Sequence, residues 1–487
     1  MTLTTIADEA RLAAGNVAGL ARELWRPTLR LGVTGLSRAG KTVFITALVH
    51  NLLHGGRLPL LDVVAEGRLR RAWLEPQPDD DVPRFDYEAH IAALTGPDRH
   101  WPESTRWISE LRLTVAYRPV GFVKRNFGRG TVHIDIVDYP GEWLLDLALL
   151  DQDYATWSQR TIAAAESPSR SHFAQPLLDL VAALDPDAPA DEQAVIHAAE
   201  IFTRFLDDSR SDAEGPGTLP PGRFLMPGEL EGSPLLTFAP LKLADGARAR
   251  RGTLHAMMER RYEAYKSRVV KPFFRDHFAR LDRQIVLVDA LDALNRGPEA
   301  VRDLKEALTG ILGAFRPGRN TWLSTILGRR IDRILFAATK ADHLHHTSHD
   351  RLKDVLAYLV GGAMERAQFA GADVSVTALA SVRATREAMV TRNGEVLPCI
   401  LGVPVAGERV GNETFSGEEE IAVFPGDLPE DPRRALAEAG SGRGDDEYRF
   451  VRFRPPRVDG TGGDAPPPLP HIRLDAALNL LLGDQFE

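Results

Sequence analysis

Residues 35–42 of this 487-residue chain read Gly-Leu-Ser-Arg-Ala-Gly-Lys-Thr and match the pattern G-x-x-x-x-G-K-[ST]. Residues 29–33 before them are apolar and read as a strand, and residues 42–53 carry apolar side chains at helical spacing. Two glycines let such a loop curl so that its N–H groups face a phosphate chain, and the helix adds the positive end of its dipole. The pattern therefore predicts a phosphate-binding loop. Its candidate nucleotide-binding residues are Gly35, Ser37, Arg38, Ala39, Gly40, Lys41, Thr42 and Val43.

Two side chains of this loop carry specific expectations. Lys41 is expected to reach the β- and γ-phosphates of a bound nucleotide, and the Thr42 hydroxyl to bind Mg²⁺. A further hydroxyl should close over Mg²⁺ and the γ-phosphate from a segment that follows the loop. Residues 101–106, Trp-Pro-Glu-Ser-Thr-Arg, offer Thr105 for this role, with Ser104 as its rival.

Residues 133–141 read His-Ile-Asp-Ile-Val-Asp-Tyr-Pro-Gly and form the second motif. A strand that ends in an acid places Asp138 at the carboxyl edge of the sheet, where ligands of open α/β folds bind. We expect Asp138 to bind Mg²⁺ through water and the Gly141 N–H to contact the γ-phosphate. Another apolar strand, residues 284–289, also ends in an acid. It has no glycine at the matching offset, so Asp289 is expected to be a neighbouring strand end that bonds to a loop.

The third motif, Thr-Lys-Ala-Asp at residues 339–342, follows an apolar strand. A carboxylate such as that of Asp342 can accept parallel hydrogen bonds from guanine N1–H and N2–H₂, which adenine cannot provide. The stem of Lys340 can cover the base, and Thr339 completes the motif. After the last predicted strand, Ser381 lies in a stretch that could offer backbone N–H groups to the base. Together these residues favour guanine over adenine.

Glu142 stands where many GTPases carry a glutamine that orients the attacking water. A carboxylate cannot donate a hydrogen bond to that transition state, and it repels phosphate charge. We therefore expect slow hydrolysis, or activation by a partner or by an arginine of this chain such as Arg38 or Arg106. The candidate catalytic residues are Lys41, Thr105, Gly141 and Glu142, and the candidate metal-binding residues are Thr42, Thr105 and Asp138.

Composition limits the partners and the compartment of the chain. A net charge of −9 argues against broad nucleic-acid binding, which needs a basic surface. One cysteine, Cys399, cannot form an internal disulfide, and residues 1–10 lack a signal-peptide core, so we expect a cytoplasmic protein. No apolar run of about 18 residues occurs, which predicts no transmembrane span and leaves peripheral membrane contact open. For the histidines at 343–349, a polar helix start is favoured over a metal site.

The chain divides into five predicted parts. These are an N-terminal helix at 1–27, the first part of a nucleotide-binding domain at 28–143, a helical insertion at 144–282, the second part of that domain at 283–385, and a β-rich C-terminal segment with a terminal helix at 386–487. Strands at 111–117 and 131–137 should form a hairpin, and Arg-Asn-Gly-Glu at 392–395 should form a hairpin turn. Strands and helices alternate from residue 285 to residue 338, which indicates a parallel sheet.

Several motifs together resemble the YcjX-like P-loop proteins of bacteria. They are Gly-Leu-Ser-Arg-Ala-Gly-Lys-Thr-Val-Phe at 35–44, Val-Asp-Tyr-Pro-Gly-Glu-Trp at 137–143, Thr-Lys-Ala-Asp at 339–342, Phe-Arg-Pro-Pro at 453–456, Leu-Pro-His-Ile-Arg-Leu-Asp at 469–475 and Leu-Gly-Asp at 482–484. The resemblance covers nearly the whole chain. It implies a G-domain of the GTPase superclass with an added helical domain, binding of GTP or GDP with Mg²⁺, and a stress-linked role. Glu142 belongs to the pattern of this family.

The sequence thus predicts an α/β fold of the P-loop NTPase type. A G-domain with a mostly parallel sheet and helices on both faces is interrupted by a helical insertion and followed by a β-rich C-terminal extension. We expect a slow, Mg²⁺-dependent GTPase that acts as a conformational switch on an unidentified protein partner or activator. One alternative is a GTP- or GDP-binding interaction module that hardly hydrolyses and docks a protein or membrane partner. The other is an ATPase, in which the third motif is coincidental.

Overall fold

The computed structural model describes most of the chain. The described residues are 28–103, 105–120, 130–211, 218–277, 280–313, 331–369, 371–392, 394–410, 413–434, 448, 450–458 and 466–487. The expected N-terminal helix at 1–27 and the candidate Ser104 lie outside these residues.

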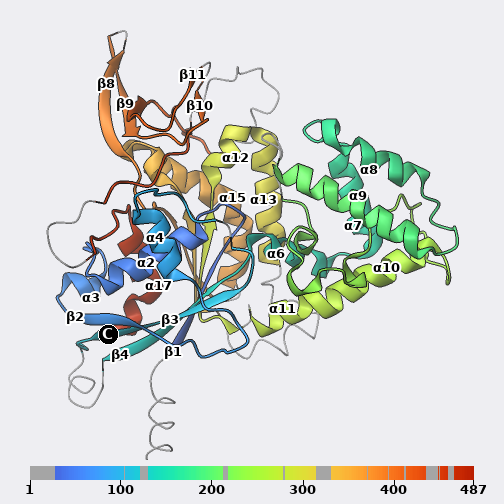
Figure 1. Cartoon of the computed structure of the whole chain (residues 1–487), viewed down its shortest axis with the longest axis horizontal. Helices are drawn as coiled ribbons and strands as arrows, with labels where there is room; N and C mark the ends of the chain where they lie inside the picture. The colour runs from blue at the N-terminus through green and yellow to red at the C-terminus, as the bar shows by residue number, and fades with distance from the viewer. Residues whose placement is uncertain are drawn as a thin grey trace, which may run out of the picture.

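A seven-stranded sheet forms the centre of the molecule, in the order β2-β3-β4-β1-β5-β6-β7 (Figure 1). Five neighbouring strands run parallel, as the alternation of strands and helices predicts. These are β4 (Thr131–Asp138), β1 (Thr28–Gly35), β5 (Arg283–Val288), β6 (Arg333–Ala338) and β7 (Asp373–Ala378). At one edge, β3 (Ser109–Tyr117) pairs antiparallel with β4, and β2 (Leu69–Glu75) pairs antiparallel with β3. The predicted hairpin of β3 and β4 is confirmed.

Helices cover both faces of the sheet because the central strands are apolar on both sides. Along β5, Ile285 and Leu287 pack into one hydrophobic cluster, and Val286 and Val288 pack into another. The first cluster includes residues of α2 (Lys41–Leu53), α3 (Asp62–Ala65), α4 (Tyr87–Thr95) and the C-terminal helix α17 (Leu474–Leu482). The second includes residues of α12 (Ala290–Arg296), α13 (Pro298–Gly313) and α15 (His349–Phe369).

Between β4 and β5 most of the described residues are helical, and they build a further hydrophobic cluster around Trp157, beside the sheet (green in Figure 1). Its helices are α6 (Gly141–Leu145), α7 (Tyr154–Ala165), α8 (Ser171–Ala183), α9 (Glu192–Ser211), α10 (Leu254–Tyr265) and α11 (Lys271–Asp276). The 3₁₀ turns are η1 (Asp146–Asp151), η2 (Gly222–Phe224), η3 (Gly228–Leu230) and η4 (Pro234–Leu236), and a π-helical turn, η5 (Lys266–Val270), joins α10 to α11. Val137 and Tyr139 belong to the same cluster, so the packing is continuous with the end of β4.

The C-terminal region is β-rich, as predicted. β8 (Arg386–Arg392), β9 (Glu395–Gly402) and β12 (Ile421–Val423) form an antiparallel sheet, and β10 (Arg409–Val410) pairs with β11 (Glu413–Thr414). Arg392 pairs with Glu395 across the predicted hairpin turn, which confirms it. Cys399 is buried on β9. The chain then returns to the first sheet as α17 and the turn η10 (Gly483–Phe486). None of the helices in the described part of the chain has an apolar stretch that could span a bilayer.

Candidate functional site

The carboxyl ends of the parallel strands bring the predicted motifs together. In the register of β1 and β4, Val33 lies opposite Asp138, so the loops that leave these two strands lie side by side. β3 runs the other way and pairs Ser109 with Asp138, which brings Thr105 to the same edge. β6 delivers the segment with Asp342 to this edge, on the other side of β5.

The loop after β1 has the geometry of an anion site. Lys41 is buried, and its Nζ donates to the carbonyl oxygens of Gly35 at 3.0 Å and Leu36 at 3.2 Å. The helix α2 begins after Gly40 with no side-chain cap and no acidic residue in its first turn. Its first N–H groups therefore stay available to an anion such as phosphate. Burial lowers the pKa of Lys41, and the nearby carboxylates of Asp138 and Glu142 oppose this shift.

Beside this loop lies a group of three oxygen-bearing side chains. The Thr42 and Thr105 hydroxyl oxygens are 3.1 Å apart, and the Thr105 hydroxyl donates to Asp138 Oδ2 at 2.5 Å. Asp138 is 1% exposed, and its other oxygen, Oδ1, is buried without a hydrogen-bond partner among the described residues. Burial raises the pKa of Asp138 to about 6, against the opposing effects of Lys41 and Thr105. An unsatisfied carboxylate oxygen beside two hydroxyls is a donor set that suits a hard divalent cation such as Mg²⁺.

Gly141 lies directly against the loop after β1. A Cβ atom at this position would be 2.6 Å from the Leu36 carbonyl carbon and 2.6 Å from the Ser37 nitrogen, so only glycine fits. The next residue, Glu142, is buried, and its Oε1 lies 3.5 Å from Arg210 Nη1 without a hydrogen bond. Gly141 and Glu142 of the second motif thus lie at the loop that joins β1 to α2.

The Thr-Lys-x-Asp segment is held by its neighbours. Asp342 is buried, and its Oδ2 accepts a hydrogen bond from the Ala384 N–H at 2.8 Å. Lys340 has a left-handed backbone, with φ of 59°, and its ammonium group pairs with Asp289. Asp289 also caps α12 by accepting from the Asp292 N–H at 3.1 Å. Asp289 therefore stands at the neighbouring strand end and bonds to a loop, as the sequence predicts.

Residues 29–486 match the model of the YcjX-like family, DUF463. The chain belongs to this family. Two curated relatives are each named "Ras-like GTPase YcjX". The one from Escherichia coli (strain K12) is 39% identical over 94% of this chain and 96% of its own length. The one from Shewanella oneidensis is 38% identical over 94% of this chain and 95% of its own length. These matches confirm the family resemblance, and with the sheet order they support a GTPase-like P-loop fold.

In this YcjX-like chain, the remaining nucleotide candidates also lie near the strand ends. The Thr339 N–H donates to the Val288 carbonyl at 2.9 Å, which joins the ends of β6 and β5. The N–H groups of Ala380 and Arg383 are taken by carbonyl oxygens of the C-terminal segment, at 3.0 Å and 2.7 Å. Ser381 between them is buried, and its N–H has no partner in the part of the chain that the structure describes.

The two arginines predicted from the sequence differ in position. Arg38 has φ of 63° and lines a cavity next to Ser37 and Ala39. Arg106 is 73% exposed on its side chain and lies 3.7 Å from Glu103. Arg210, which the sequence did not single out, lines the same cavity as Arg38. The rest of that cavity is formed by Leu36, Gly141, Glu142, Leu145, Thr218, Leu287, Val288, Asp289, Asp292, Ala293, Arg296, Ala300, Leu304 and Leu308.

Sequence reasoning also missed the contacts that hold α6. Trp143 Nε1 donates to the Met226 carbonyl at 3.0 Å, and the Arg223 guanidinium lies 3.2 Å from the centre of the Trp143 ring. Asp146 accepts from the Gly222 N–H at 2.6 Å and from the Tyr265 hydroxyl at 2.5 Å. No local sequence pattern predicts these contacts, because the partners lie on separate helices and turns between β4 and β5.

Proposed function

We propose that this chain is a Mg²⁺-dependent guanine-nucleotide-binding protein that hydrolyses GTP slowly and uses its nucleotide state to move the helices between β4 and β5. The observation that carries the proposal is the cluster of Lys41, Thr42, Thr105 and Asp138 beside an uncapped helix N-terminus, with one Asp138 oxygen unsatisfied. The name "Ras-like GTPase" of two relatives supports the same chemistry.

The phosphate end of the nucleotide would lie on the loop that precedes α2. The first N–H groups of α2 donate to phosphate oxygens, and Lys41 neutralises the charge between the β- and γ-phosphates. Thr42, Thr105 and Asp138 would hold Mg²⁺, which when bound offsets phosphate charge. The backbone of Gly141 lies against the loop, where a side chain would not fit. Its N–H is therefore suited to contact the γ-phosphate.

The base would lie at the ends of β6 and β7. Asp342 provides the carboxylate that pairs with guanine N1–H and N2–H₂. The Ala384 N–H holds this carboxylate from one side, and the Asp289 ion pair holds the side chain of Lys340 at the neighbouring strand end. The free N–H of Ser381 can donate to a carbonyl oxygen of the base. Because the Asp342 carboxylate pairs with guanine and not with adenine, the ATPase alternative is the weaker one.

Slow hydrolysis follows from the position of Glu142. Glu142 lines the same cavity as Ser37 and Ala39 of the loop before α2, so its carboxylate would lie near the phosphates of a nucleotide bound there. A carboxylate accepts but does not donate hydrogen bonds, so it cannot stabilise charge that develops on the γ-phosphate. The same observation favours the second candidate, an interaction module that binds GTP or GDP with little hydrolysis and docks a partner.

The coupling to the helices rests on the contacts of α6. We treat residues 144–282 as an insertion domain that senses the γ-phosphate through this short helix. Glu142 pairs with Arg210, Trp143 is held by Arg223 and the Met226 carbonyl, and Asp146 bonds to Gly222. A shift of Gly141 on loss of the γ-phosphate would therefore be transmitted directly to the helical segment.

Calorimetric titration with GTP and ATP, in Mg²⁺ and in chelator, tests the proposal. We expect GTP to bind at least about 100-fold more tightly than ATP, which corresponds to two hydrogen bonds to a charged group. Asp138→Asn should remove the effect of Mg²⁺ on GTP affinity, and the exposed control Asp373→Asn should retain it. Equal affinity for the two nucleotides would contradict guanine selectivity.

Single-turnover hydrolysis separates the enzyme from the interaction module. We expect a rate on the order of 10⁻² s⁻¹ or slower without a partner. A rate in the tens per second would contradict the proposed role of Glu142. If GTP stays intact over many hours, the interaction module is the correct candidate.

A further inference from the structure

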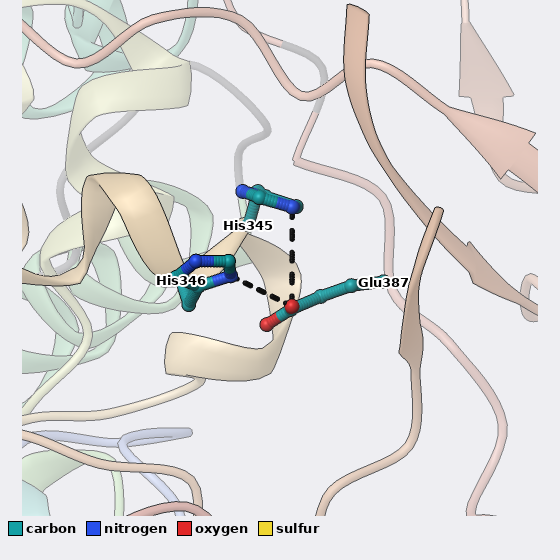
Figure 2. Close-up of side chains that lie close together, drawn as sticks. All are labelled: His345, His346 and Glu387. Carbon is teal, nitrogen blue, oxygen red and sulfur yellow. Dashed lines mark hydrogen bonds and ion pairs between the residues drawn. The ribbon is translucent and has the colours of Figure 1, made fainter. Parts of the chain in front are cut away.

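Three side chains with metal-ligating atoms converge outside the phosphate site (Figure 2). His345 and His346 follow the 3₁₀ turn η7 (Ala341–His343), which contains Asp342, and His346 opens the next turn, η8 (His346–Ser348). Glu387 lies on β8, in a different part of the chain. One ligand atom of each residue lies within 4.8 Å of the other two. The fold, and not sequence spacing, assembles this group.

The distances fit a small metal ion. Glu387 Oε2 lies 2.7 Å from His346 Nδ1 and 3.8 Å from His345 Nε2 (Figure 2). A tetrahedral ion with bonds of about 2.05 Å separates its ligand atoms by about 3.3 Å. The two distances lie on either side of this value, so small side-chain rotations would bring the three atoms into a coordination sphere.

Two of the three ligands, His345 and Glu387, are also oriented through their other polar atom. His345 Nδ1 lies 3.0 Å from Thr347 Oγ1, and with Nδ1 as the donor the lone pair of Nε2 faces the carboxylate. Arg383 Nη2 lies 3.9 Å from Glu387 Oε1, which leaves Oε2 turned to the histidines. Outer contacts of this type hold histidine and carboxylate ligands in metal sites.

We propose that His345, His346 and Glu387 bind a divalent transition metal ion such as Zn²⁺. Two imidazoles and one carboxylate suit zinc, whereas Mg²⁺ takes oxygen ligands only. The side chain of His346 is 64% exposed and that of His345 is 9% exposed, so the ion enters from solvent and water fills the remaining coordination position.

The site has a mechanical consequence for the neighbouring base-recognition segment. The residues just before Glu387 contact Asp342: the Ala384 N–H donates to its carboxylate at 2.8 Å, and the Thr385 hydroxyl donates to its carbonyl. A metal ion would join Glu387 to the two histidines that follow Asp342. The segment with Ala384 and Thr385 would then be fixed to the segment with Asp342 by the metal ion as well as by these hydrogen bonds. If the proposed function holds, the bound metal therefore raises the affinity for guanine nucleotide.

Titration of the full-length, tag-free, chelator-treated protein with Co²⁺ tests the site, since tetrahedral Co²⁺ has visible absorption bands. We expect one Co²⁺ per chain, displaced by Zn²⁺. His346→Ala and Glu387→Gln should each weaken binding by at least about tenfold. His346 is exposed and glutamine matches glutamate in size, so both variants should fold. His100→Ala, which removes another exposed histidine, should bind Co²⁺ like the wild type.

Three results would overturn the site. The absence of stoichiometric Co²⁺ binding, or equal binding by wild type and His346→Ala, would leave the cluster as a simple ion pair. Loss of the absorption bands in Asp138→Asn would place the ion at the phosphate site. The effect of Zn²⁺ on GDP affinity is measured separately. An unchanged GDP affinity would contradict the coupling between the metal site and nucleotide binding. If GDP does not bind at all, the proposed function is contradicted, and the Co²⁺ spectrum still decides the metal site.

Discussion

The Glu142 carboxylate and the Arg210 guanidinium lie 3.5 Å apart, and this ion pair joins the residue after Gly141 to the last turn of α9. Glu142 is almost fully buried, whereas the Arg210 side chain is 25% exposed. The pair therefore brings a positive charge from the helical segment to the edge of the candidate phosphate site.

The first prediction concerns the preference for GTP over GDP. Glu142→Gln should raise the ratio of GTP to GDP affinity by roughly tenfold, because one negative charge near the γ-phosphate is removed. Arg210→Ala should lower the ratio, because the charge of Glu142 is then uncompensated. Calorimetry on the two single variants and the double variant gives the coupling energy, for which we expect at least about 0.5 kcal/mol. An unchanged ratio in both single variants would show that the pair does not sense the γ-phosphate.

The second prediction concerns base recognition by Asp342. Asp342→Asn keeps an oxygen that can accept from the Ala384 N–H, so the fold should be retained. The amide offers a donor where the carboxylate accepted, so GTP should bind at least about 100-fold more weakly. Xanthine has a carbonyl in place of the guanine amino group, so the variant should bind xanthosine triphosphate better than GTP. Competition titrations measure this exchange, with Asp373→Asn as the surface control.

The sheet could be predicted largely from the sequence because its central strands are short apolar runs separated by helical segments. β2 is the exception. Its residues Leu-Arg-Arg-Ala-Trp-Leu-Glu show no alternation of buried and exposed positions, and the edge strand gains its place by pairing with β3. Its antiparallel pairing to β3 depends on tertiary contacts that no local pattern encodes.

The site divides in the same way. Lys41, Thr42 and Asp138 lie in motifs next to strands, and strand direction alone brings them to one edge. Arg210 and Glu387 could not be predicted, because their partners Glu142 and His346 depend on how distant helices and a hairpin pack. Sequence spacing contains no information on such contacts between elements that are far apart in the chain.

The third prediction tests the contact between α6 and the turn at Gly222. A Cβ atom at this position would lie 1.8 Å from the Glu142 carbonyl oxygen, so Gly222→Ala forces two backbone segments apart. We expect a loss of at least about 2 kcal/mol in unfolding free energy, measured by urea denaturation. Gly361→Ala is the matched control, since a Cβ there meets nothing within 4 Å on helix α15. It should stabilise the protein by about 0.5–1 kcal/mol. Equal effects of the two substitutions would contradict the close contact.

The fourth prediction uses the pH dependence of stability. Burial raises the pKa of Asp146 to about 6, although Tyr265 and Gly222 donate hydrogen bonds to it. The folded protein then holds a proton on Asp146 between about pH 4 and pH 6, where the unfolded chain has already released it. The contribution of Asp146 to stability is therefore fully present below about pH 4 and is lost as the pH rises through 6.

Asp146→Asn isolates this contribution because asparagine does not titrate and still accepts from the Gly222 N–H. As the pH rises from 4 to 6, the unfolding free energy of the wild type should fall relative to that of the variant, by up to about 1.4 kcal/mol per pH unit. Above pH 6 the difference should level off. Taking the difference cancels the contributions of the other titrating groups, which wild type and variant share. Asp138, whose pKa is also raised to about 6, should give the same curve in Asp138→Asn. A flat difference curve for either variant would show that burial does not raise the pKa of that carboxylate, and would contradict the prediction for it.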